Sequence, residues 1–165
     1  MLKLVCVIGG MTMREVQLEA IETEKRNLFF DYLLIADESE EIVREYINDG
    51  EMFSICCEGK IVGVVLFTFH SNGIVELKNI ALTEDYRGKG LGKIVVNEAF
   101  NLYKIKGLHK MIVGTANSSI ENLAFYQKVG FRMVEIKKNF FKNYPTPIYE
   151  DGIRALDMVM FEKEL

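Results

Sequence analysis

The chain has 165 residues, of which 49% are hydrophobic and 27% are charged, and its formal net charge is −4. This length fits one domain with a sizeable core, and the apolar content excludes an intrinsically disordered chain. The longest apolar run, residues 61–69, has about half the length of a membrane-spanning helix. The acidic balance disfavours nucleic-acid binding, and three cysteines without a Cys-x-x-Cys motif predict a reduced, cytoplasmic setting.

The first half of the chain predicts one strand, two helices and a three-stranded meander. Residues 1–13 form either an N-terminal extension or an edge strand, without a targeting role. Strands are expected where apolar and polar residues alternate or where an apolar run is bounded by turn residues, at residues 14–20, 52–58, 61–69 and 74–82. The two helices follow the first strand and span residues 25–36 and 39–48. Asn72-Gly73 is a hairpin signal, and His70 beside it is interpreted as a turn residue.

The second half begins with a polar, glycine-rich loop and continues with helices between short strands. Helical spacing and a capping box, Ser118-x-x-Glu121, predict helices at residues 93–106 and 118–128. The expected strands are residues 111–115, 131–136 and 154–161. No repeat or linker divides the chain, so the sequence predicts a single α/β domain.

The glycine-rich loop Arg87-Gly88-Lys89-Gly90-Leu91-Gly92 lies between an expected strand and an expected helix. Glycines at this place let backbone N–H groups approach a phosphate at the positive end of the helix dipole. A P-loop does not fit, because Gly88 and Gly92 are one residue too close and Ile94 replaces the hydroxyl that binds Mg²⁺. A dinucleotide fold fits weakly, because the next strand ends at Asn117 without a carboxylate. A tight turn without a ligand is the structural alternative.

A coenzyme A site is the third interpretation, because here the sequence resembles the GNAT superfamily of N-acetyltransferases. The central motif of that family is Gln/Arg-x-x-Gly-x-Gly/Ala, which Arg87, Gly90 and Gly92 match. A second signature, Tyr-x-x-x-Gly-Phe, is matched by residues 126–131, and the resemblance covers residues 14 to 162. Residues 114–131 and the tail also resemble one bacterial branch of these proteins, and this closer likeness implies no particular acceptor.

The resemblance implies a fold, a reaction and partners. The fold would be one α/β (α+β) domain over residues 1–165, with a central, mixed, mostly antiparallel six- to seven-stranded sheet flanked by helices on both faces. The reaction would transfer the acetyl group of acetyl-CoA, as co-substrate, to a primary amine by direct attack in a ternary complex without a metal. The acceptor would be a small-molecule or peptide amine, with no nucleic acid or membrane as partner. A homodimer is a candidate assembly, since dimers are common in the family.

The resemblance also assigns the coenzyme contacts, mostly to the backbone. N–H groups of Arg87, Gly88, Lys89, Gly90, Leu91 and Gly92 would hold the pyrophosphate. The strand end Ile80, Ala81 and Leu82 would pair with the pantetheine arm and polarise the thioester carbonyl. Asn117 and Asn122 lie near the start of the next helix, where a coenzyme contact and a helix cap are both open; the Asn usual in the family is here Ser119.

Two side chains resemble the acid and the base of the family. Tyr126 corresponds to the tyrosine that protonates the departing thiolate, and the alternative is a tyrosine packed in the core. Glu76 corresponds to a glutamate that removes a proton from the attacking ammonium, and the alternative is a carboxylate paired with a lysine of a neighbouring strand. The aromatic loop 139–153 would border the acceptor or form a dimer contact.

Other functions remain open at the level of the sequence. Within enzymes, the acyl group could differ from acetyl, or the acceptor could be a protein amine. Outside enzymes, the chain could be a regulatory domain that binds coenzyme A without turnover, or a structural interaction module that binds no thioester.

Overall fold

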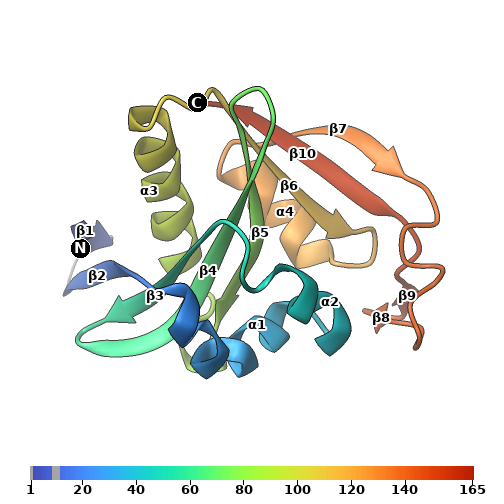
Figure 1. The fold of residues 1–165 in the computed structure, drawn as a ribbon, viewed down its shortest axis with the longest axis horizontal. Coiled ribbons are helices and arrows are strands. Elements are labelled where there is room, and N and C mark those ends of the chain that lie inside the picture. Colours follow the sequence, from blue (N-terminus) through green and yellow to red (C-terminus); the bar gives the residue numbers. More distant parts are fainter. Residues whose placement is uncertain (1, 9–11) are drawn as a thin grey trace.

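The computed structural model describes residues 2–8 and 12–165, and a central β-sheet dominates this part of the chain (Figure 1). Its strands are β1 (Leu2–Ile8), β2 (Thr12–Ala20), β3 (Glu51–Cys57), β4 (Lys60–His70), β5 (Ile74–Leu82), β6 (Lys110–Ala116), β7 (Arg132–Lys137) and β10 (Met158–Glu164). A separate two-stranded sheet consists of β8 (Tyr149–Glu150) and β9 (Ile153–Arg154). The helices are α1 (Phe30–Ala36), α2 (Glu40–Tyr46), α3 (Leu91–Ile105) and α4 (Ile120–Lys128), with short 3₁₀ helices η1 (Thr23–Phe29) and η2 (Glu84–Tyr86).

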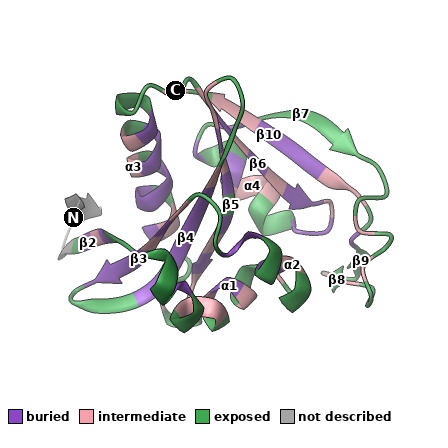
Figure 2. Cartoon of the chain, in the orientation of Figure 1, coloured by how far each residue is buried: buried purple, intermediate pink, exposed green. Residues whose placement is uncertain are grey.

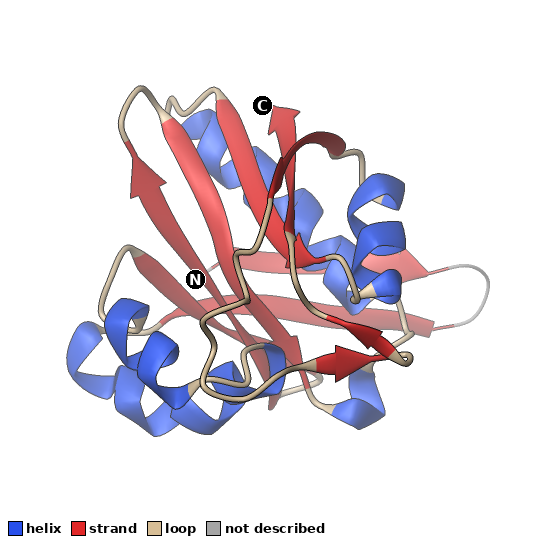
Figure 3. Cartoon of the chain, turned by 90° about the vertical axis from the view of Figure 1, so that its right-hand side faces the viewer, coloured by secondary structure: helices blue, strands red, loops and turns tan. Residues whose placement is uncertain are grey.

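The strands of the described chain follow the order β1-β2-β3-β4-β5-β6-β10-β7. Every neighbouring pair is antiparallel except β5 and β6, which run parallel. Helices cover both faces of the sheet, α1 and α2 on one and α3 and α4 on the other (Figure 3). The predicted fold class is therefore confirmed. The described sheet has eight strands instead of the expected six to seven, because β1 pairs along β2 at its edge.

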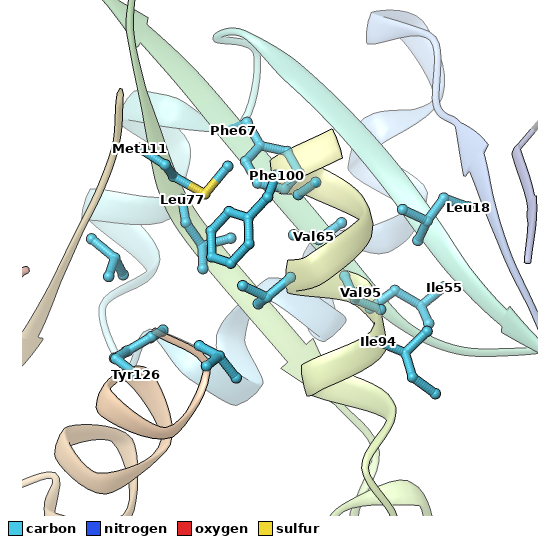
Figure 4. Close-up of a cluster of buried hydrophobic side chains, with 14 of the residues drawn as sticks. Leu18, Ile55, Val65, Phe67, Leu77, Ile94, Val95, Phe100, Met111 and Tyr126 are labelled. Atoms are coloured by element: carbon cyan, nitrogen blue, oxygen red, sulfur yellow. The ribbon is translucent and has the colours of Figure 1, made fainter. Parts of the chain in front are cut away.

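Two hydrophobic clusters fill the space between the sheet and its helices. The cluster under α3 and α4 includes Phe67, Leu77 and Val95, all buried (Figure 4). The cluster under α1 and α2 is smaller and includes Leu33 and Val43. Because both faces are covered, the centre of β4 is buried on both sides, as its apolar run predicts (Figure 2).

The helix predicted over residues 25–36 begins differently in the structure. Residues 23–29 form the 3₁₀ helix η1, and α-helical geometry begins only at Phe30. The Arg26 guanidinium is buried and donates to the backbone oxygens of Ile47, Asp49 and Gly50, which ties η1 to the end of α2. Leu28, which the helical spacing assigns to the core, is 80% exposed because this anchoring turns it outward.

The sheet opens between β5 and β6. Only residues 74–76 of β5 pair with residues 110–112 of β6, and beyond them the two strands separate (Figure 1). Just after this point β5 contains a bulge, because Leu77 pairs with Phe67 and Asn79 with Leu66, which leaves Lys78 as the extra residue. A bulge increases the local twist of a strand. The edge of residues 77–82 that faces β6 consequently has no strand partner in the described chain.

Candidate active site

The end of β5 offers backbone groups rather than side chains. Ala81 is buried in the α1–α2 cluster, while Ile80 and Leu82 pack against the other cluster. The side chains of these three residues therefore pack in the two hydrophobic clusters. The edge toward β6 retains N–H and C=O groups that an extended ligand can pair with as an added strand.

The glycine loop after β5 presents donors to solvent at the start of α3. Gly88 and Gly90 adopt left-handed φ angles of 67° and 79°, and Gly90 caps α3 without a side-chain bond. The first intrahelical bond joins Ile94 N to Gly90 O at 3.2 Å, so the N–H groups of residues 91–93 have no helical acceptor. The side chains of Arg87, Lys89 and Lys93 are exposed around them, and the first turn has no acidic residue. This combination suits a pyrophosphate.

Two side chains of the loop also have structural contacts. Arg87 Nε donates to the Leu82 backbone oxygen at 3.0 Å, which folds the loop back onto the end of β5. Leu91 is 1% exposed and belongs to the core, so only its backbone can face a ligand.

Gly92 brings α4 close to the first turn of α3. A Cβ atom at this position would lie 3.3 Å from Cζ of Phe125, which is tighter than ordinary packing. The missing side chain thus lets α4 approach the glycine loop, and with it the predicted acid Tyr126, the residue after Phe125.

Tyr126 lies in an aromatic environment and is 6% exposed. Its ring lies 5.3 to 5.7 Å from those of Phe125, Phe131 and Phe161, and it reaches from α4 toward the core (Figure 4). Burial raises the pKa of the Tyr126 phenol, so the group keeps its proton at neutral pH. Burial is the one cause of this shift, and no side-chain hydrogen bond contributes to it. A protonated phenol is able to act as a proton donor.

Glu76, the predicted base, is the last residue of β5 that pairs with β6. Its side chain is 17% exposed, and Oε2 lies 2.6 Å from His70 Nε2 at the end of β4. Its Oε1 lies 3.9 Å from Lys78 Nζ on the same strand. The lysine near Glu76 is therefore on the same strand as Glu76. The residue that contacts Glu76 from the neighbouring strand is a histidine and not the lysine of the alternative interpretation.

The two asparagines near α4 have contacts within the protein. Asn117 Oδ1 accepts from the backbone N–H groups of Leu156 and Asp157, and its Nδ2 donates to the Arg154 oxygen at 3.2 Å. Asn122 Nδ2 lies 3.4 Å from Thr115 Oγ1. Asn117 thus joins the end of β6 to the segment before β10, and a coenzyme contact would compete with these bonds.

The expected capping box at the start of α4 does not form. Ser119 is the N-cap residue, and its side chain makes no cap bond. The hydroxyls of Ser118 and Ser119 instead donate to the Glu150 carboxylate at 3.1 and 2.7 Å. The box is lost because a stronger, charged acceptor from β8 takes both hydroxyls. This bond anchors the loop before β10 to α4.

A polar network that the sequence did not predict lies on the α1–α2 side of β5. Asn79 is 5% exposed, and its Nδ2 donates to Leu33 O at 3.0 Å and Tyr46 Oη at 2.9 Å. Tyr46 Oη donates in turn to Asp37 Oδ2 at 3.2 Å. Burial and the nearby Asp37 carboxylate raise the pKa of Tyr46. The one signal in the sequence is a polar residue within an apolar strand, and it does not identify its partners.

A cavity of about 210 Å³ lies elsewhere, beside β2 and β3. It contains none of the predicted site residues. Its lining consists of Ala20, Ile21, Arg26, Glu51, Met52, Phe53 and Lys106. Lys106 Nζ binds both oxygens of Glu51, so these opposite charges already satisfy each other.

Comparisons with known proteins identify the family of the chain. The sequence model of the acetyltransferase (GNAT) family matches residues 17–131. An uncharacterised N-acetyltransferase of Bacillus subtilis, YvbK, is 37% identical over 156 residues, which are 94% of this chain and 100% of the relative. A GNAT acetyltransferase of Elizabethkingia anophelis with acetyl-CoA bound has a TM-score of 0.85 and 35% identity, over 91% of this chain and 98% of the other. A Bacillus subtilis acetyltransferase in complex with CoA has a TM-score of 0.83 and 37% identity, over 91% and 99%.

Within residues 2–8 and 12–165, no helix is both long and apolar enough to cross a membrane. In the same part of the chain, no three or more His, Cys, Asp or Glu side chains gather as metal ligands.

Proposed function

Because this chain belongs to the acetyltransferase (GNAT) family, we propose that it transfers the acetyl group of acetyl-CoA to a primary amine by direct attack in a ternary complex. The observation that carries the proposal is the opening of the sheet between β5 and β6 beside a loop rich in free N–H groups. This arrangement fits a ligand with an extended arm and a pyrophosphate. The relatives that bind acetyl-CoA or CoA support the identity of that ligand.

The backbone does most of the binding in this proposal. N–H groups of residues 88–92 hold the pyrophosphate. The backbone N–H of Arg87 instead donates to Glu84 O at 3.1 Å, and the side chains of Arg87 and Lys89 add positive charge. The free edge of Ile80–Leu82 pairs with the pantetheine arm and donates to the thioester carbonyl oxygen as negative charge develops on it. Fixing the thioester beside the amine gives much of the rate by orientation alone.

Glu76 and Tyr126 handle the protons. Glu76 takes a proton from the acceptor ammonium, which frees the nitrogen lone pair for attack on the carbonyl carbon. A C–N bond then forms and the C–S bond breaks. The Tyr126 phenol protonates the departing sulfur, and the second proton that the nitrogen loses restores the phenol. The Tyr126 phenol holds its proton at neutral pH, so a proton is available as negative charge develops on the sulfur.

The acceptor is expected to enter from the α1–α2 side of β5. Tyr144 in the loop before β8 is half-buried, and its pKa is raised to about 12 by burial and by the carboxylates of Asp37 and Glu45. These neighbours bring the loop close to α2, so loop and helix can border one site. Carboxylates and aromatic rings together favour a cationic acceptor, and we propose a small-molecule or peptide amine.

Coenzyme binding is tested first, by thermal unfolding with acetyl-CoA and with ATP or NADH as controls. Acetyl-CoA at ~100 times its Kd should add about 2.7 kcal/mol, or roughly 5–10 °C for a chain of this length. Arg87→Ala should reduce the shift, whereas Lys104→Ala, which removes an exposed charge at the opposite end of α3, should not. If acetyl-CoA gives no shift, the glycine loop is a tight turn without a ligand, and the proposal is contradicted.

Turnover is tested by the release of free CoA thiol with spermidine, glucosamine and an alanine-initiated peptide. Transfer to one of them, lost in Tyr126→Phe, is the expected result. Tight acetyl-CoA binding with no transfer to any amine would instead favour a regulatory domain. Faster release of CoA thiol from longer acyl-CoA thioesters would mean that the transferred group is a longer acyl group and not acetyl.

A further inference from the structure

A carboxylate–imidazole pair leads from the point where β5 and β6 separate toward solvent. Glu76 Oε2 and His70 Nε2 are 2.6 Å apart, which is a short, direct hydrogen bond. The Glu76 side chain is 17% exposed, whereas that of His70 is 47% exposed. One end of the pair is therefore mostly screened from water, and the other is in contact with it.

The order of the strand residues gives this pair a direction. Glu76 pairs with Thr68 of β4, and His70 pairs with Ile74, two residues farther from the thioester-binding segment. Along the direction of β5 the groups therefore follow in the order Ile80–Leu82, Glu76 and His70. His70 is the last residue of β4, beside the turn that leads to β5. His70 lies on the side of Glu76 away from the proposed reaction centre.

The reaction has to export a proton in each turnover. A protonated amine and a thioester give an amide, a free thiol and one proton, since sulfur retains only one of the two protons that nitrogen loses. Glu76 holds the exported proton after it has acted as base. Glu76 must return to its carboxylate form before the next acceptor binds, and its side chain has little contact with water.

We propose that His70 accepts this proton from Glu76 and releases it to solvent, so that the two side chains form a proton exit. The proposal rests on the role of Glu76 as base under the proposed function. Imidazole suits the task because one ring nitrogen accepts a proton while the other releases one, at pH values near neutral. His70 is then a positioning and relay residue that acts on the reaction through Glu76.

The other charges around Glu76 cannot perform this step. Lys78 Nζ lies 3.9 Å from Oε1 and over the Tyr46 ring of α2, and a lysine ammonium has no free electron pair to accept a proton. From β6, the Lys110 ammonium contacts Glu162 and Glu164 instead. Neither lysine can thus take the proton from Glu76, and His70 provides the acceptor.

The sign of the pH dependence follows from this arrangement. An imidazolium cannot accept a second proton, so kcat should rise with pH as His70 loses its charge. In His70→Gln the amide keeps a hydrogen bond to Glu76 but does not titrate. We expect kcat to fall by about tenfold or more, the KM for acetyl-CoA to stay unchanged, and this limb of the pH profile to disappear.

Chemical rescue separates a relay from a structural contact. Imidazole added to the buffer should raise kcat of His70→Gln with increasing concentration and leave the parent enzyme unaffected. The assay uses the panel amine that gives the fastest CoA release. The chain has two histidines, so His109→Gln is the matched control, and it should keep the parent profile and show no rescue. Equal thermal unfolding of all variants verifies the fold.

A second measurement needs no acceptor. Nuclear magnetic resonance should resolve two imidazole side chains, assigned with His109→Gln, and the ring resonances of His70 should move in Glu76→Gln because its hydrogen-bond partner has changed. Unchanged His70 resonances would overturn the pair. Parent-like kcat and pH profile in His70→Gln, with Glu76→Gln inactive, would overturn the relay alone. Full activity in Glu76→Gln would overturn the base itself.

Discussion

The two sides of β5 are built on different principles. On the α3–α4 side, apolar side chains fill the core, and the candidate coenzyme contacts come from the backbone of β5 and of the glycine loop. On the α1–α2 side, the candidate acceptor region depends on polar side chains: Asn79 with Tyr46, and Glu76 with His70. The candidate coenzyme contacts are therefore independent of side-chain identity, whereas the candidate acceptor region depends on it.

Alkaline pH should produce the largest effect, because it acts on both sides at once. The pKa of Tyr126 is raised by burial alone, and that of Tyr46 by burial and by Asp37. Both folded values lie above the unfolded value of about 10. The contribution of these two tyrosines to the free energy of unfolding is fully present below pH 10. It is lost as pH rises toward the folded pKa, by about 1.4 kcal/mol per pH unit for each tyrosine.

This loss is measured as the free energy of unfolding against pH, with tyrosinate absorbance recorded in parallel. Ionisation of the buried tyrosines should coincide with unfolding. Tyr46→Phe should make the pH dependence shallower. Ionisation of all tyrosines in a still-folded chain would contradict the burial of these phenols.

Tyr126→Phe separates catalysis from stability on the coenzyme side. We expect kcat to fall by about 100-fold or more, since the proton donor to sulfur is removed. The free energy of unfolding should change little, because no side-chain hydrogen bond contributes to the pKa of the hydroxyl. Tyr149→Phe, at an exposed tyrosine, is the control. A parent-like kcat would assign Tyr126 to packing alone.

Asn79→Ala should show the reverse pattern on the opposite side. Two buried acceptors, Leu33 O and Tyr46 Oη, lose their donor, which should lower the free energy of unfolding by about 2–4 kcal/mol. Acetyl-CoA affinity should change much less, and the acceptor KM should rise. Denaturant unfolding and binding titrations measure these quantities, with the exposed Asn97→Ala as control. A large loss of acetyl-CoA affinity would break the separation between the two sides.

Glu150→Gln should have the smallest effect, on the loop before β10. The serine hydroxyls would exchange a charged acceptor for a neutral one, a loss of about 1 kcal/mol. The loop at residues 139–153 should then be cut faster by protease. Asp151→Asn, an exposed neighbour, should leave the rate unchanged. Equal rates in both variants would show that this carboxylate does not hold the loop.

The sequence predicted the parts of the molecule that depend on local patterns. The strands, the hairpin at Asn72-Gly73 and the glycine loop follow from neighbouring residues, and both turn residues have left-handed φ angles of 63° and 70°. The start of α1 was misjudged because Arg26 bonds to residues more than twenty positions away. His70, Asn79 and Glu150 were missed for the same reason, since their partners meet them only after folding.

The opening between β5 and β6 has a mechanical consequence. In the described chain, three residue pairs join the five strands β1–β5 to the three strands β6, β10 and β7 across this line. A substrate arm lying along β5 would fill the opening and make the sheet continuous through the co-substrate itself. Each cycle of loading and release would then stiffen and loosen the junction between the two halves, and amide hydrogen exchange along β6 would follow the occupancy of the enzyme.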